Sequence, residues 1–138
     1  MTRKGPDDRT RKGTYDVEAI EGLLAFAVTR PRWGGRAALK SASEAITRSR
    51  ALAQRSPGDY TVLLSRCLLT AAKLLLGRGR AAEALPLAEE AVALTRPVGG
   101  APLVVSLGCL ATALEALHRY SEAAATHAEV DRVPPPPD

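Results

Sequence analysis

The side chains best suited to metal or redox chemistry in this 138-residue chain are two cysteines and two histidines. Cys67 and Cys109 are 42 residues apart, and neither belongs to a C-x-x-C pair. We expect both to be buried structural thiols, with a disulfide or a metal site as the less favoured alternatives. His118 and His127 have no cysteine or carboxylate pattern at ligand spacing around them, so no metal site is predicted.

Groups suited to catalysis are also few. The segment GRGR at residues 77–80 lacks the lysine and the preceding strand that a phosphate-binding loop needs. Glu89 and Glu90 are adjacent, so on a helix they point in different directions and do not form a carboxylate pair. No serine or cysteine nucleophile matches a histidine base by local motif. The sequence therefore predicts no enzymatic activity and no cofactor.

Charge is distributed unevenly along the chain, whose formal net charge is +4. Residues 1–55 hold 12 Lys or Arg against 6 Asp or Glu, whereas residues 56–138 hold 7 against 9. A basic half is suited to nucleic acid, an anionic surface or an acidic partner. The alternative is a solvated tail with an exposed helix face, and Trp33 is then a loop anchor rather than a base-stacking group. The residues of this possible basic patch are Arg11, Lys12, Arg30, Arg32 and Arg36.

The clearest indication of secondary structure in the sequence is a repeat. The dipeptide Glu-Ala occurs at residues 44–45, 83–84 and 122–123, at two equal intervals of 39 residues. Small and apolar residues at helical spacing follow each copy. A period of about 20 to 50 residues is typical of stacked units that bury their apolar faces against one another. The chain is therefore predicted to be all-α, with antiparallel helix hairpins stacked as a short α-solenoid.

The last two copies of the repeat resemble the tetratricopeptide repeat (TPR). That family's motif has large, small, aromatic and alanine positions in this order. Leu68 and Leu107 occupy the large position, Ala72 and Ala111 the small one, Leu75 and Leu114 the aromatic one, and Ala84 and Ala123 the alanine one. The interval is longer than the roughly 34 residues of the family, and we expect the extra residues at 96–102. The resemblance covers about 80 residues. It implies pairs of antiparallel helices joined by tight turns.

Six helices in three hairpins are predicted, flanked by two tails. The hairpins are expected at about residues 15–56, 59–96 and 101–132. Residues 1–14 are mostly charged or turn-forming and are predicted to be a basic disordered tail. Residues 133–138 are predicted to be a proline-rich tail.

The first hairpin is irregular in sequence. Residues 29–36 read TRPRWGGR, and a proline followed by two glycines does not continue a helix. We therefore expect a first helix over residues 16–29 and a loop over residues 30–35. The second helix of this hairpin is expected over residues 36–55.

The resemblance also implies a binding surface, because in TPR proteins the first helix of each pair lines a concave groove. Carried over position by position, the groove residues of the second and third units are Arg66, Leu69, Thr70, Lys73 and Leu76, and Val105, Gly108, Cys109, Thr112 and Glu115. For the irregular first unit the residues suggested are Glu18, Glu21 and Ala25. No chaperone-tail clamp is expected, because Leu69 occupies a clamp lysine position. Arg66 and Lys73 are suited to one carboxylate, unless they are ordinary surface charges.

The outer side of the last hairpin is expected to lack a cover. The residues VPPPPD at 133–138 follow that hairpin directly, whereas repeat arrays usually close with a polar helix face. The side chains expected to be uncovered include Leu107, Leu114, Ala124 and Ala128. A second copy of the chain, a partner or the remainder of a longer protein would then cover them.

These features together predict a cytoplasmic adaptor or scaffold that binds a protein or peptide in its groove or at its open end. The alternative is a regulatory protein whose basic N-terminal half contacts nucleic acid or an anionic surface. We expect no membrane span, because the apolar stretch at residues 103–117 is shorter than the roughly 20 residues that a span needs. The charged N-terminal residues also lack the apolar run of a signal peptide.

Overall fold

The structure is a computed structural model, and it describes residues 6–29 and 35–137, with side chains from residue 13 onward. The described residues form six α-helices and no strand, which confirms the prediction of an all-α chain with six helices. In chain order the helices are α1 (Pro6–Thr29), α2 (Gly35–Arg55), α3 (Pro57–Gly77), α4 (Ala81–Thr95), α5 (Gly100–Ala116) and α6 (Tyr120–Asp131).

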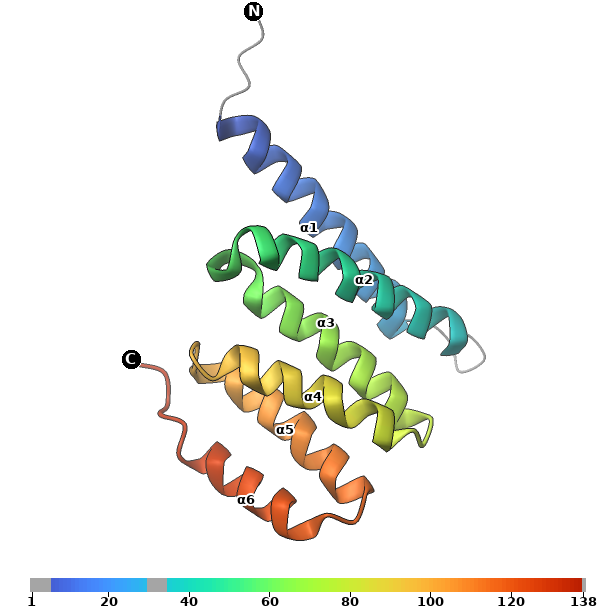
Figure 1. Ribbon diagram of the computed structural model, residues 1–138, viewed down its shortest axis with the longest axis vertical. Helices are drawn as coiled ribbons and strands as arrows, with labels where there is room; N and C mark the ends of the chain where they lie inside the picture. Colours follow the sequence, from blue (N-terminus) through green and yellow to red (C-terminus); the bar gives the residue numbers. More distant parts are fainter. Residues whose placement is uncertain (1–5, 30–34, 138) are drawn as a thin grey trace, which may run out of the picture.

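Each helix packs against the next one along the chain. Figure 1 shows the helices following one another in chain order, from α1 at the top to α6 at the bottom. The helix α3 also contacts α1 and α5, so the three odd-numbered helices lie side by side. The N-terminal part of α1 projects beyond its neighbours (Figure 1).

The central core is formed by leucines of α3 that pack against alanines of α4. Alanine has a small side chain, which allows the two helix backbones to approach closely, and leucine fills the remaining space. The buried members of this central core are Leu64, Leu68, Leu69, Ala72, Leu75, Ala84, Ala88, Ala91 and Cys109. A second buried cluster joins the first three helices and comprises Ile20, Leu24, Ala45, Leu52, Leu63 and Cys67.

The turns inside the last two hairpins have the same hydrogen bonds. Between α3 and α4, the N–H of Arg80 donates to the carbonyl of Leu75 at 2.9 Å, and that of Gly79 donates to Leu76 at 3.0 Å. This pair of bonds is a Schellman motif, in which the residue after the helix cap has a left-handed conformation. The turn between α5 and α6 repeats both bonds 39 residues later, from Arg119 to Leu114 and from His118 to Glu115, each at 2.9 Å.

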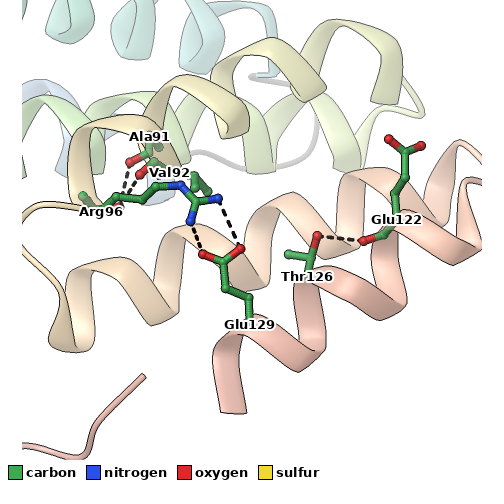
Figure 2. Close-up of polar contacts among 7 residues, drawn as sticks. Ala91, Val92, Arg96, Glu122, Thr126 and Glu129 are labelled. Carbon is green, nitrogen blue, oxygen red and sulfur yellow. Dashed lines mark hydrogen bonds and ion pairs between the residues drawn. The ribbon is translucent and has the colours of Figure 1, made fainter. Parts of the chain in front are cut away.

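The even-numbered helices are joined by two arginine–glutamate pairs, of which only the glutamates are at repeat-related positions. Arg50 of α2 donates to both carboxylate oxygens of Glu90 in α4, at 2.5 and 3.2 Å. Glu129 of α6 lies 39 residues after Glu90 and accepts two hydrogen bonds from Arg96, at the end of α4 (Figure 2). Both pairs are partly exposed, so each stabilises the fold by at most about 1 kcal/mol.

Two expected boundaries differ from the structure. The disordered tail expected over residues 1–14 is helical from Pro6 onward, so α1 begins ten residues before the expected start at Asp16. Proline is favoured in the first turn of a helix, which agrees with a start at Pro6. Residues 1–5 lie outside the described residues. The helix α3 likewise begins at Pro57, which occupies its first turn.

The outer side of the last hairpin also differs from the expectation. Leu107 and Leu114 were expected to lack a cover, but they are buried, with 0% and 5% of their surface exposed. Leu107 packs in a cluster with Val92 and Leu103, and Val130 and Val133 lie against that cluster. Leu107 is therefore covered by α4 as well as by residues of its own hairpin. Of the four residues expected to be uncovered, only the two alanines reach the surface, because Ala124 is exposed and Ala128 is half-buried.

One helix meets the length and composition of a membrane span. The helix α3 is 21 residues long and apolar, and half of its most apolar stretch is buried inside the structure. The core helix of a protein in water meets the same criterion when neighbouring helices cover it. The expectation of no membrane span rests on residues 103–117 and not on this helix.

Candidate binding face

The exposed sides of α1, α3 and α5 form one surface, here called the odd-helix face. We define it by Glu18, Glu21 and Ala25 of α1, Arg66, Thr70 and Lys73 of α3, and Val105, Gly108, Thr112 and Glu115 of α5. These side chains lie on the sides of their helices that point away from the leucine core, since they alternate with buried residues at helical spacing. All ten are residues that the resemblance to TPR proteins singled out.

Arg66 and Glu21 form the tightest polar contact on the odd-helix face. The guanidinium of Arg66 donates from Nη1 to Oε1 of Glu21 at 2.6 Å and from Nη2 to Oε2 at 3.1 Å. This paired geometry holds the pKa of Glu21 below its ordinary value and raises that of Arg66. The carboxylate expected to bind at Arg66 is therefore supplied by the chain itself, and a partner's carboxylate must displace Glu21 to reach this arginine.

Lys73 is the exposed cation of this face that has no such partner. Among the described side chains it makes no ion pair or hydrogen bond, although its charge acts on the nearby thiol of Cys109. Lys73 and Arg66 are seven residues apart on α3, which places them two helical turns apart along one side. The ammonium of Lys73 is thus available to a carboxylate from another molecule.

The remaining polar groups of the face are bonded within the chain. The hydroxyls of Thr70 and Thr112 donate to the carbonyls of Arg66 and Gly108, at 2.9 and 3.0 Å. Oε1 of Glu115 lies 2.7 Å from Nε2 of His127 on α6. Both threonine hydroxyls keep free lone pairs, so they can accept hydrogen bonds but do not offer a donor.

Three of the expected groove residues lie in the core instead. Leu69 and Cys109 are only 4% and 6% exposed and belong to the central core, and Leu76 is half-buried against it. Leu69 and Leu76 of α3 pack in the same cluster as Cys109 of α5, so these three side chains lie between the two helices and do not take part in the odd-helix face. Two adjacent valines of α5 are exposed, Val104 at 36% and Val105 at 49%, and of these the sequence reading named only Val105.

The expected basic patch is described only in part. Arg30 and Arg32 lie outside the described residues, and Arg11 and Lys12 lie in α1 but their side chains are not described. Arg36 is exposed in the first turn of α2, a turn that contains no acidic residue.

A second cation approaches Arg36 from a different hairpin. A methyl group built on Gly35 would lie 3.3 Å from Nη1 of Arg78, so this guanidinium reaches the beginning of α2. Within the described part of the chain, neither the Arg36 nor the Arg78 side chain has an ion-pair partner. Arg78 was missed because it belongs to a turn about 40 residues later, and no sequence pattern joins the two.

The cysteines are free and buried, as expected for structural thiols. Burial raises the pKa of both thiols above the ordinary value, and the hydrogen bond to Ser49 only partly offsets this for Cys67. Thiols in this state are poor nucleophiles, because the reactive form is the thiolate. Within the described residues, no group of three histidine, cysteine or acidic side chains is placed to hold a metal ion.

No family model matches the chain, and no curated protein or solved structure matches it significantly either. The function proposed below therefore depends on the chain's own residues.

Proposed function

We propose that the chain is a TPR-like helical-hairpin repeat domain that binds a protein or peptide partner on its odd-helix face. In this proposal the three hairpins form a short solenoid, and the partner lies across α1, α3 and α5. The domain then acts as an adaptor or scaffold. It works by holding a partner and not by carrying out a reaction.

The single observation that carries this proposal is the composition of the exposed surface along α3 and α5. The unpaired ammonium of Lys73 and the exposed side chain of Val105 both belong to the odd-helix face, on helices that pack together, and the adjacent Val104 is also exposed. Apolar surface beside a charged group favours a partner segment that presents an apolar side chain and a carboxylate. Glu21 and Arg66 neutralise each other next to this area, so Lys73 is the cation of α3 on this face that remains unpaired among the described side chains.

The test compares two matched double variants of the full chain in affinity capture at high salt. The face variant combines Lys73→Glu with Val105→Asp, and the control variant combines Lys40→Glu with Ala93→Asp on the exposed sides of α2 and α4. We expect a partner to be retained by the wild type and the control but at least about tenfold less by the face variant, a loss of about 1.4 kcal/mol. Equal capture by both variants would contradict the proposal.

A second candidate function is binding of nucleic acid or an anionic surface by the basic half of the chain. Arg36 and Lys40 of that half favour it, together with Arg78, whose guanidinium reaches the beginning of α2, because these exposed cations have no ion-pair partner among the described residues. Binding of a labelled oligonucleotide is measured across a range of salt concentrations. If this candidate is right, affinity falls steeply with salt, and replacing Arg36 and Arg78 by alanine lowers the slope of that plot by about 1 to 2.

A further inference from the structure

The segment that follows α6 has an unusual combination of an anchored start and exposed prolines. The side chain of Val133 lies against the cluster of Val92, Leu103 and Leu107, and its N–H donates to the carbonyl of Val130 at 3.1 Å. Residues 134–137 are four consecutive prolines, all exposed and outside any helix. The chain thus leaves the folded domain at a fixed point and then presents the prolines to solvent.

The covalent structure of proline fixes the conformation of this segment. Each proline ring holds φ near about −65°, and a residue that precedes proline is kept out of the helical region. Val133 and the first three prolines all precede a proline, so the segment favours the extended polyproline II helix. Little conformational entropy remains to be lost when this segment binds, and its affinity benefits accordingly.

The hydrogen-bonding groups of the segment indicate what kind of surface it fits. Proline has no N–H, so residues 134–137 offer carbonyl acceptors and apolar ring faces but no backbone donor. In the described part of the chain, no backbone hydrogen bond outside the helices uses these carbonyls. A complementary surface therefore needs aromatic side chains for the rings and hydrogen-bond donors, such as tryptophan N–H or tyrosine O–H, for the carbonyls.

We propose that residues 133–137 are a second binding element, which docks in the aromatic-lined groove of a polyproline-recognition domain of another protein. Recognition of a preformed polyproline II helix by such grooves is an established mode of peptide binding. The element belongs to the segment after α6 and takes no part in the odd-helix face. It therefore goes beyond the function proposed above and does not depend on it. A domain with both elements joins two partners.

The test measures binding of the full chain to three purified probes, an SH3, a WW and an EVH1 domain, by isothermal titration calorimetry. We expect at least one probe to bind, and Pro134→Ala combined with Pro137→Ala to weaken that binding at least about tenfold, since two ring contacts and part of the preformed conformation are lost. The variant retains the helical fold by circular dichroism, because both prolines lie outside the helices.

Pro97 provides the matched control, because it is an exposed proline in the connection between α4 and α5. Pro97→Ala leaves the binding unchanged if residues 133–137 are the element that is recognised. The proposal is overturned if none of the three probes binds at about 1 mM, or if the Pro134 and Pro137 variant binds as tightly as the wild type.

Discussion

The hairpins α3–α4 and α5–α6 have the same turn hydrogen bonds but different side chains on the side that faces away from the first hairpin. In α3–α4 these side chains are apolar and are covered by α5, whereas 39 residues later the same positions are polar, charged or glycine. The four pairs are Leu69 and Gly108, Leu76 and Glu115, Ala88 and His127, and Val92 and Asp131.

The backbone of the repeat is therefore the same in both hairpins, whereas the polarity of its side chains depends on whether a neighbouring helix covers them. His127 and Asp131 are exposed where Ala88 and Val92 are buried, and His127 pairs with Glu115 on this surface. Repeat arrays commonly have a polar surface of this kind at a terminal unit. A homo-oligomer through this hairpin stays a prediction, and light scattering over a wide range of protein concentration tests it.

The largest losses of stability are expected from two repeat-related leucines, one in each hairpin, whose side chains are completely buried. Leu68→Ala and Leu107→Ala each remove a side chain with 0% exposure, and each costs about 2–5 kcal/mol of unfolding free energy. Hydrogen exchange distinguishes them, because α5–α6 has a neighbouring hairpin on only one side. Leu107→Ala should raise exchange mainly in α5 and α6, and equal acceleration in α1 and α2 would contradict this.

Leu69 and Gly108 should respond in opposite directions to substitution by alanine. Leu69→Ala leaves a cavity in the central core and costs about 2–4 kcal/mol. Gly108 lies inside α5, and an added methyl group there has no atom within 4 Å, so Gly108→Ala stabilises by about 0.5–1 kcal/mol. Urea denaturation measures both values. A destabilising Gly108→Ala would mean that another part of the molecule covers this position.

Smaller changes in stability, of opposite sign, are expected from exchanging the two residues with a left-handed conformation in the turns. Gly79 has φ of 73°, and His118, 39 residues later, has φ of 63°. A positive φ of this size costs a residue with a side chain about 1 kcal/mol. His118→Gly relieves this cost but loses the contact with the Tyr120 ring, whose centroid is 5.7 Å away, so a gain of about 0.5 kcal/mol is expected.

The reverse change, Gly79→Ala, should cost about 1 kcal/mol, because alanine is strained at a positive φ. Thermal unfolding of the two variants provides the measurement. His118→Asn serves as the control, since asparagine tolerates this conformation better than most residues. A destabilised His118→Gly variant with an unchanged fold would show that the histidine side chain outweighs the backbone strain.

The smallest effect is expected for the ion pair between Glu21 of α1 and Arg66 of α3. No equivalent ion pair joins the described side chains of α3 and α5. The positions related to Glu21 and Arg66 are Tyr60 and Val105, which form no ion pair. Because the pKa of Glu21 is lowered in the folded state, its contribution is present above the unfolded carboxyl value of 4.5 and is lost as pH falls through the lower folded value.

Glu21→Gln removes that contribution. Both side chains are about half exposed, so the expected loss at neutral pH is at most about 0.5 kcal/mol and disappears in acid. Urea denaturation at a series of pH values compares this variant with Glu18→Gln, which changes an exposed glutamate of the same helix. A difference between wild type and Glu21→Gln that grows as the pH falls would contradict the assignment.

The helices could be predicted from the repeat, but the beginning of α1 could not. The buried stripe that includes Ile20 and Leu24 marks the second half of α1. Residues 7–13 contain no apolar side chain, so this segment has no hydrophobic periodicity, although Pro6 and the two aspartates after it favour a helix start.

The sequence could indicate most residues of the candidate face, but it could not indicate which of their side chains contact each other. The positions carried over from the resemblance to TPR proteins include the exposed residues Lys73 and Val105, but also Leu69, which is buried, because a middle helix is covered on two sides by neighbours that a single sequence does not reveal. Arg66 and Glu21 are 45 residues apart, and their pairing depends on how α1 and α3 pack. Long-range ion pairs of this kind leave no periodic signal in the sequence.

The two buried cysteines lie in different hairpin interfaces, Cys67 among α1, α2 and α3 and Cys109 among α3, α4 and α5. A thiol that is buried reacts with an alkylating reagent only when its surroundings open. The rates at which Cys67 and Cys109 are labelled therefore report separately how often each interface opens, without any probe having to be introduced.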